Sequence, residues 1–203
     1  MTVNDQAQWL QRGFADPLLD AQISFRAALN ALAEPGTVQR MDKAQGLGAL
    51  DQATYSLCLA LLDNDTAVWL APCFDTAEIR ANLAFHCGCE FVSDRSQASF
   101  ALLDQAALGD LSGFYIGSER FPDQSCTLFI QLDSLVGGAL QQWSGPGING
   151  VRDVTLPLPL EFWQQRAARN AFPRGLDCLF SAQGSVVGLP RSTRITPMVE
   201  EVA

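Results

Sequence analysis

Short apolar runs with strand character alternate with helical segments along most of the chain, and this alternation constrains the fold more than any other feature. Helices are predicted at residues 50–62 and 160–172. Near the end, "DCLFSA" and "SVVGLP" flank Gln183-Gly184, which predicts an antiparallel hairpin. The other predicted strands lie within residues 37–41, 64–72, 89–92, 98–104, 126–132 and 139–143. The pattern predicts a three-layer α/β fold with a mixed sheet.

Capping residues mark the ends of the predicted helices. Asp16 or Asp20 can cap the first helix, and Pro35-Gly36 ends it. Thr76, or the aspartate before it, can cap a later helix, and Gly88 stands where a C-terminal glycine is expected. These boundaries place the helices between the strands rather than beyond them.

The size of the chain predicts one domain over residues 1–203. Its 203 residues suit one well-filled core, and 48% hydrophobic with 17% charged residues is typical of a globular protein. Charged residues interrupt each apolar stretch too soon for a membrane span. The N-terminal residues lack the basic start and apolar centre of a signal peptide, so we expect a cytoplasmic protein that does not bind membranes.

The charge is distributed unevenly along the chain. The formal net charge of −9 argues against nucleic acid as the main partner. Residues 1–150 hold 7 basic and 17 acidic side chains, whereas residues 151–203 hold 6 arginines and 5 acids. We therefore expect any anion site to draw on the C-terminal quarter.

The segment "WSGPGING" at residues 143–150 has the G-x-G-x-x-G spacing of a dinucleotide-binding loop. That loop requires a strand before it and a helix after it, because the helix N-terminus holds the pyrophosphate. Here the following segment, "VRDVTLPLPL", has the pattern of extended chain. The residues Gly145, Pro146 and Gly147 instead fit a type II turn, with proline at its second position and glycine at its third. We interpret the segment as consecutive turns.

Two short segments near the C-terminus, "FPRGLD" and "LPRSTR", suggest an anion site. They hold three arginines and two hydroxyl side chains: Arg174, Arg191, Arg194, Ser192 and Thr193. Guanidinium groups that converge at one end of the sheet suit a phosphate or phosphonate. The alternative is that these arginines pair with acids, Asp177 first, and hold the loops in place. Spacing alone leaves both interpretations open.

Two further clusters hold groups with chemical potential. His86, Cys87 and Cys89 offer three ligands of the kind that zinc prefers, but their spacing favours a helix C-terminus and we expect no metal there. Glu119 and Asp123 flank a proline turn and could act as acid and base or as Mg²⁺ ligands. Exposed turn acids are the commoner case.

Taken together in their order, six segments resemble the PhnH subunit of the bacterial carbon–phosphorus lyase system. They are "DAQISFRAALNALAEPGTV" (20–38), "FHCGC" (85–89), "GSERFPDQSCTL" (117–128), "SGPGI" (144–148), "FPRGLD" (172–177) and "LPRSTRI" (189–195). The family typically has "FHTGA" where this chain has "FHCGC", so Cys87 and Cys89 depart from its pattern.

The resemblance implies a fold similar to a reduced pyridoxal-phosphate-dependent transferase without the cofactor. The only lysine, Lys43, lies outside the matched segments, which agrees because pyridoxal phosphate needs a lysine for its Schiff base.

It also implies a homodimer that joins sister subunits in a cytoplasmic complex. That complex displaces adenine from MgATP with a phosphonate and forms ribose 1-phosphonate 5-triphosphate, and MgATP is bound by the assembled complex. In the family a sister subunit is thought to carry this chemistry, so no catalytic residue is transferred to the present chain.

Two hypotheses follow: an accessory or scaffolding subunit, or a subunit that contributes an arginine-lined phosphate or phosphonate pocket to a shared active site. We prefer both to a third, an autonomous enzyme, because the sequence shows no nucleophile, metal set or lysine for one. A scaffold predicts exposed apolar interface patches. The tryptophans Trp9, Trp69, Trp143 and Trp163 are candidate interface anchors, although we expect Trp69 to belong to the core. Trp143, beside the "SGPGI" turn, is the one we expect at a subunit surface or pocket rim.

Overall fold

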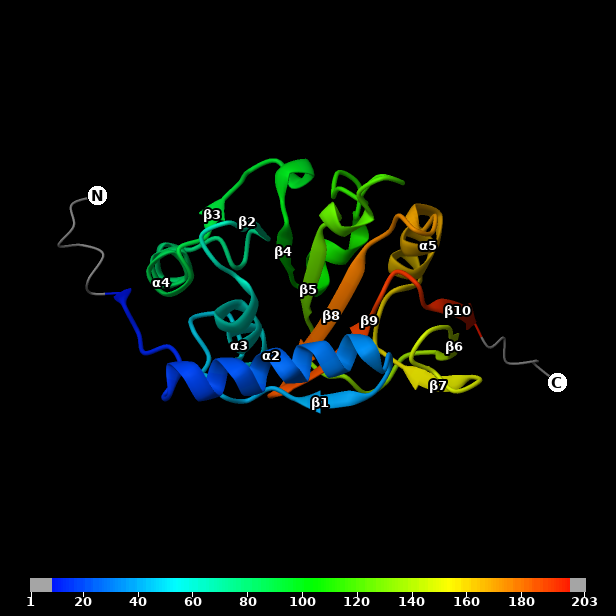
Figure 1. The fold of residues 1–203 in the computed structure, drawn as a ribbon, viewed down its shortest axis with the longest axis horizontal. Helices are drawn as coiled ribbons and strands as arrows, with labels where there is room; N and C mark the ends of the chain where they lie inside the picture. The colour runs from blue at the N-terminus through cyan, green and yellow to red at the C-terminus, as the bar shows by residue number, and fades with distance from the viewer. Residues whose placement is uncertain (1–8, 198–203) are drawn as a thin grey trace.

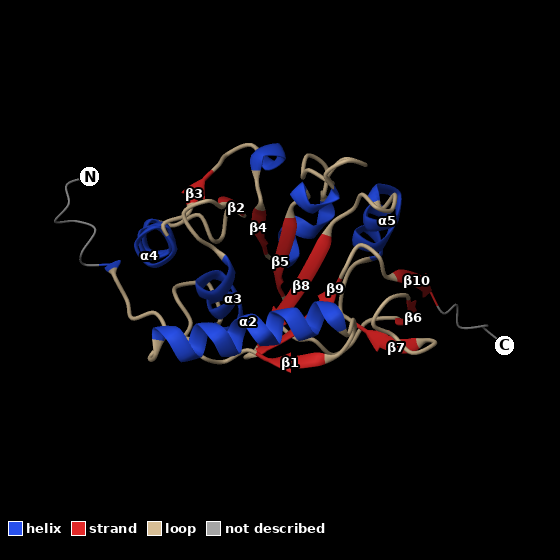
Figure 2. Ribbon diagram, in the orientation of Figure 1, coloured by secondary structure: helices blue, strands red, loops and turns tan. Residues whose placement is uncertain are grey.

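A mixed seven-stranded sheet runs through the centre of the molecule (Figures 1 and 2). The computed structural model describes residues 9–197. The strand order is β1-β9-β8-β5-β4-β2-β3. The bounds are β1 (Val38–Arg40), β2 (Ala67–Leu70), β3 (Glu90–Phe91), β4 (Phe100–Leu103), β5 (Thr127–Gln131), β8 (Asp177–Ala182) and β9 (Ser185–Leu189). Neighbours from β3 to β8 are parallel, whereas β9 and β1 pair antiparallel. The prediction of an α/β fold with a mixed sheet is confirmed.

Each face of this sheet is covered by a different layer. The helices α2 (Pro17–Ala33), α3 (Gln52–Leu61) and α4 (Ala77–Cys87) lie on one face. The other face carries α5 (Leu160–Arg169), the 3₁₀ helix η3 (Gln105–Gly109) and a small antiparallel sheet of order β10-β6-β7. The strands of that sheet are β6 (Leu140–Ser144), β7 (Arg152–Thr155) and β10 (Arg194–Pro197).

The buried side chains of β5 show how one sheet serves two cores. Phe129 belongs to the core under α2, α3 and α4, whereas Leu128 and Ile130 belong to the core on the other face. This alternation follows from the strand backbone, which points successive side chains to opposite sides. Strands buried on both faces are typical of parallel sheets covered by helices.

The capping predictions are confirmed where the helices begin and end. The Asp16 carboxylate accepts the N–H groups of Leu18 and Leu19 at the start of α2. The Thr76 hydroxyl accepts the N–H of Ile79 at 3.2 Å, which satisfies a helix donor that has no partner within the helix. α4 ends at Gly88 in the left-handed conformation, with φ of 72°. No described helix is both long and apolar enough to cross a lipid bilayer.

The small sheet differs most from the sequence-based expectation. The predicted strand at 139–143 is present as β6, but it pairs with β7 and β10 and not with the central sheet. β10 was not predicted as a strand. Of its four residues only Ile195 packs against a core, so the strand has little apolar pattern and is held mainly by pairing with the distant β6.

Candidate functional site

A cleft of about 860 Å³ lies between α5 and the segment 191–197. This segment follows β9, which runs antiparallel to β8, so the cleft lies at the edge of the sheet where β8 begins. Three arginines (Arg166, Arg191 and Arg194) contribute to its lining, and none of its described lining residues is acidic. The cleft therefore concentrates positive charge in a chain whose net charge is −9.

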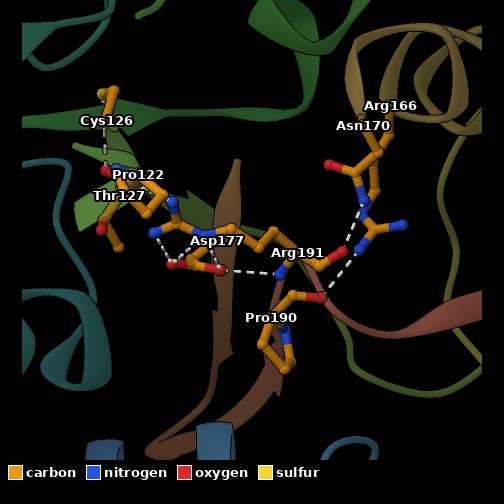
Figure 3. Close-up of polar contacts among 8 residues, drawn as sticks. All are labelled: Pro122, Cys126, Thr127, Arg166, Asn170, Asp177, Pro190 and Arg191. Carbon is orange, nitrogen blue, oxygen red and sulfur yellow. Dashed lines mark hydrogen bonds and ion pairs between the residues drawn. The ribbon is translucent and has the colours of Figure 1, made fainter. Parts of the chain in front are cut away.

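Arg191 is held by a half-buried carboxylate (Figure 3). Its Nη2 lies 2.5 Å from Asp177 Oδ2 and its Nε lies 3.1 Å from the same oxygen. Its Nη1 donates to the carbonyl of Pro122. One guanidinium therefore joins the segments "LPRSTR", "FPRGLD" and "ERFPDQ". For Arg191 the geometry favours the interpretation of structural pairing with Asp177.

Arg166 is buried in the wall of the cleft, at 4% exposure. Its Nη2 donates to the carbonyls of Pro190 at 2.9 Å and Thr193 at 3.4 Å, and no described acid lies within 4.0 Å of it. Asn170, one turn further along α5, donates to the carbonyl of Arg191 at 2.9 Å. Burial lowers the pKa of the Arg166 guanidinium. α5 thus fixes the turn 190–193 with a buried cation (Figure 3).

The prediction of one pocket lined by three arginines requires a correction. Arg174 does not line the cleft. Its backbone pairs with Ala171 in a tight loop after α5, and its Nε is buried without a described hydrogen-bond partner. Arg194 lines the cleft from β10 and is exposed, and Ser192 and Thr193 line it as well. The cleft therefore brings together four of the five candidate residues, of which Arg191 is already paired.

The glycine-rich segment forms the predicted turn and leads into β7 instead of a helix. The N–H of Ile148 donates to the carbonyl of Gly145 at 3.1 Å, and Gly147 has φ of 81°, as a type II turn requires. A side chain at Gly147 would collide with the carbonyl of Ala33 at the end of α2. Glycine therefore lets the backbone of this turn approach the backbone of α2 closely. Pro146 also lines the cleft that holds Arg166, Arg191 and Arg194, called the arginine cleft below.

The remaining polar candidates lie outside the cleft. Glu119 and Asp123 are exposed and make no described ion pair. The His86 ring lies 2.9 Å from the carbonyl of Gln11, whereas the Cys87 thiol faces the carbonyl of Cys58. The histidine and this thiol thus contact different parts of the chain, and no group of three metal-ligating side chains occurs within residues 9–197.

The prediction that Trp143 lies at a subunit surface or pocket rim is wrong. Trp143 is fully buried, with its Nε1 3.3 Å from Gln141 Oε1, so its place is the core and not a subunit surface. Trp163 of α5 packs edge-on against Trp143 and Phe162 and lines the cleft. Trp69 is half-buried and packs against the core on both faces of the sheet.

The opposite edge of the sheet, where the parallel strands end, is closed by the start of α3. The Asp51 carboxylate accepts the N–H groups of Thr54 at 2.7 Å and Gln183 at 3.0 Å. The Asp51 N–H donates to Gln131 Oε1 at 2.8 Å, and the hydroxyls of Thr54 and Ser181 are 2.7 Å apart. Open α/β sheets commonly bind ligands at this edge, but here a side chain of the protein caps the helix.

Sequence reasoning did not identify Arg166 and Trp163 as parts of the cleft. The available signal was the spacing on α5, where Phe162 and Arg166 lie four residues apart and share one face of the helix. Both are buried in the structure. Because Arg166 lies one helical turn after Phe162, its side chain is buried on the same face of α5, where it donates to backbone carbonyls.

Comparison with known proteins agrees with the six quoted segments. The family described as "Bacterial phosphonate metabolism protein (PhnH)" matches residues 12–196. A protein of Rhizobium meliloti (strain 1021), called "Alpha-D-ribose 1-methylphosphonate 5-triphosphate synthase subunit PhnH", is 35% identical over 194 residues. The match covers 94% of this chain and 97% of that protein. The chain belongs to the PhnH family of bacterial phosphonate metabolism proteins.

Proposed function

We propose that this chain is an accessory subunit of a synthase that forms α-D-ribose 1-methylphosphonate 5-triphosphate in bacterial phosphonate catabolism. The support is the match to the subunit of Rhizobium meliloti over nearly the full length of both chains. His86, the only histidine, is bound to the N-terminal segment and lies outside the cleft. This favours a role in assembly over independent catalysis.

An exposed apolar stripe on α2 is the observation that carries the accessory role. Leu18, Phe25 and Leu29 are 85%, 48% and 53% exposed. Their spacing of seven and four residues places them on one face of the helix, and α2 lies along the outside of the molecule (Figure 1). Exposed apolar patches on soluble proteins commonly mark interaction surfaces. We propose that this α2 stripe docks a sister subunit of the synthase.

The test is copurification of the full chain with its sister subunits after a change in the stripe. The double variant L18E/L29E places two carboxylates in the proposed interface and should reduce complex recovery at least tenfold, because buried unpaired charges are costly. A84E, on the exposed side of α4, is the matched control and should copurify normally. Unchanged recovery of folded L18E/L29E would exclude the α2 stripe as the docking surface.

The alternative, a phosphate or phosphonate pocket contributed to a shared active site, is favoured by the arginine cleft. Because Arg191 is already paired with Asp177, Arg194 is the residue to change in the same assay. R194Q complexes that assemble fully but lose synthase activity would favour the shared site. Full synthase activity of the R194Q complexes would favour the accessory role over the shared site.

The remaining properties are proposals that follow from the family. We propose a cytoplasmic homodimer that works without pyridoxal phosphate, with MgATP bound by the assembled complex. The side chain of Lys43 is exposed and lies outside the cleft, whereas a Schiff-base lysine needs a desolvated pocket. The likeness to pyridoxal-phosphate-dependent transferases also stays a prediction.

A further inference from the structure

The arginine cleft combines an apolar wall with positive charge. Leu160, Trp163 and Ile195 line it together with the guanidinium-bearing residues Arg166 and Arg194. A volume of about 860 Å³ lies in the range of sites for small organic molecules. A bare inorganic anion would leave the apolar part of such a space unfilled.

Several polar atoms beside the cleft lack a partner in the described part of the chain. Arg166 is 4% exposed, pairs with no described acid, and leaves its Nε unsatisfied. Thr193 is 2% exposed and its hydroxyl is also unsatisfied. Burying a cation without a counter-ion is unfavourable, and an anion placed in the cleft would offset that cost.

Only one guanidinium of the cleft is both exposed and free of a described ion pair. Arg191 is neutralised by Asp177 and Arg166 is occupied by carbonyls, whereas Arg194 is exposed at the cleft. The charged part of a matching ligand is therefore small, and the larger part of the ligand meets apolar side chains.

We propose that this cleft binds a small organic monoanion with an aromatic or aliphatic body. The oxyanion group pairs with Arg194 and lies beside the Ser192 hydroxyl. The positive charge of the buried Arg166 attracts it further, and the apolar body packs on Trp163. Binding at this site does not require assembly with a synthase, so its test is independent of the test of the proposed function.

The test is a fluorescence titration of the full chain with 8-anilinonaphthalene-1-sulfonate, an aromatic monoanion. The neutral N-phenyl-1-naphthylamine has a similar body without the charge and serves as the reference probe. R194Q should weaken binding of the sulfonate about tenfold, since a charge-assisted contact is lost, and leave binding of the neutral probe unchanged. R40Q removes an exposed arginine on β1 that does not line the cleft, and should change neither.

Two further measurements make the outcome decisive. The proposal would be overturned if R194Q left the affinity for the sulfonate unchanged, or if R40Q lowered that affinity as much as R194Q does. So would sulfonate binding that is lost in L29E instead, because the probe would then occupy the α2 stripe. Inorganic phosphate at millimolar concentration should compete weakly with the sulfonate. Displacement by phosphate at a concentration equal to that of the probe would show a simple phosphate site and refute the amphipathic ligand.

Discussion

The guanidinium of Arg191 connects three segments that are far apart in the sequence. It pairs with Asp177 at the start of β8 and donates to Pro122 before β5. The two charged side chains are only 16% and 18% exposed, so water screens their attraction less than at the surface. Removing the cation would leave the carboxylate partly buried and unpaired.

We therefore expect R191A to lower the free energy of unfolding by about 2–3 kcal/mol, less than the loss for a fully buried pair. R191K should fall between R191A and the unchanged protein, because lysine keeps the charge but not the forked geometry. The measurement is urea denaturation followed by circular dichroism. R40A breaks a pair whose arginine is 85% exposed and should change stability by less than about 0.5 kcal/mol. Equal losses in R191A and R40A would contradict the structural role of Arg191.

At the scale of elements, the turn between β6 and β7 fastens the small sheet to the end of α2. Two glycines of this segment make it possible to measure separately how much stability depends on a positive φ and how much on close approach of the turn to α2. Gly147 and Gly150 have φ of 81° and 76°. A side chain at Gly147 would meet the carbonyl of Ala33, whereas one at Gly150 would meet nothing within 4 Å.

G150A should therefore cost about 1 kcal/mol, from the positive φ alone. G147A should cost at least about 2 kcal/mol more, because the turn must move away from α2. Chemical denaturation of both variants measures the difference. If the two losses were equal, the contact with α2 would contribute nothing to stability.

The elements that the sequence predicted well are those specified by local chemistry. The start of α4 at Thr76 and its end at Gly88 were predicted because caps act within a few residues. The hairpin of β8 and β9 around Gln183-Gly184 was predicted for the same reason. β10 could not be predicted, because it is defined by pairing with β6 about fifty residues earlier.

At the scale of the whole molecule, three of the six arginines after residue 150 line the cleft, and the charge distribution did not predict which three. The relative excess of arginine after residue 150 pointed to this region. However, Arg174 does not line the cleft, whereas Arg166 does and is buried. The spacing on α5 indicates that Arg166 is buried together with Phe162, but it does not show that α5 packs beside the segment 191–197. Nor did the sequence show that the small sheet buries Trp143.

Thiol reactivity gives a prediction for the whole molecule. Of the six cysteines only Cys73 is exposed. Burial, and after it the hydrogen bond and charge of Asp104, raise the pKa of Cys73 to about 11. We expect one thiol to react with Ellman's reagent in the folded protein and all six after unfolding.

Because the thiolate is the reactive form, the rate should rise about tenfold per pH unit below pH 11. D104N removes one cause of the raised pKa and should speed the reaction near pH 8, whereas C73A should abolish it in the folded state. A rate that levels off near pH 8.5 would show that the pKa of Cys73 is unperturbed.

The Asp51 carboxylate at the start of α3 has a consequence for what this sheet can recognise. Helix-start amides at the ends of parallel strands are a common receptor for the phosphate of a ligand. Here the Asp51 carboxylate accepts one helix-start amide, that of Thr54, and the amide of Gln183 in the β8–β9 hairpin. A tethered group competes at an effective concentration of about millimolar order, so a dissolved phosphate of equal intrinsic affinity would need a comparable concentration to displace it. At that edge the fold therefore uses its own carboxylate where an open sheet would bind the anion of a ligand, and any outside anion would have to compete with Asp51.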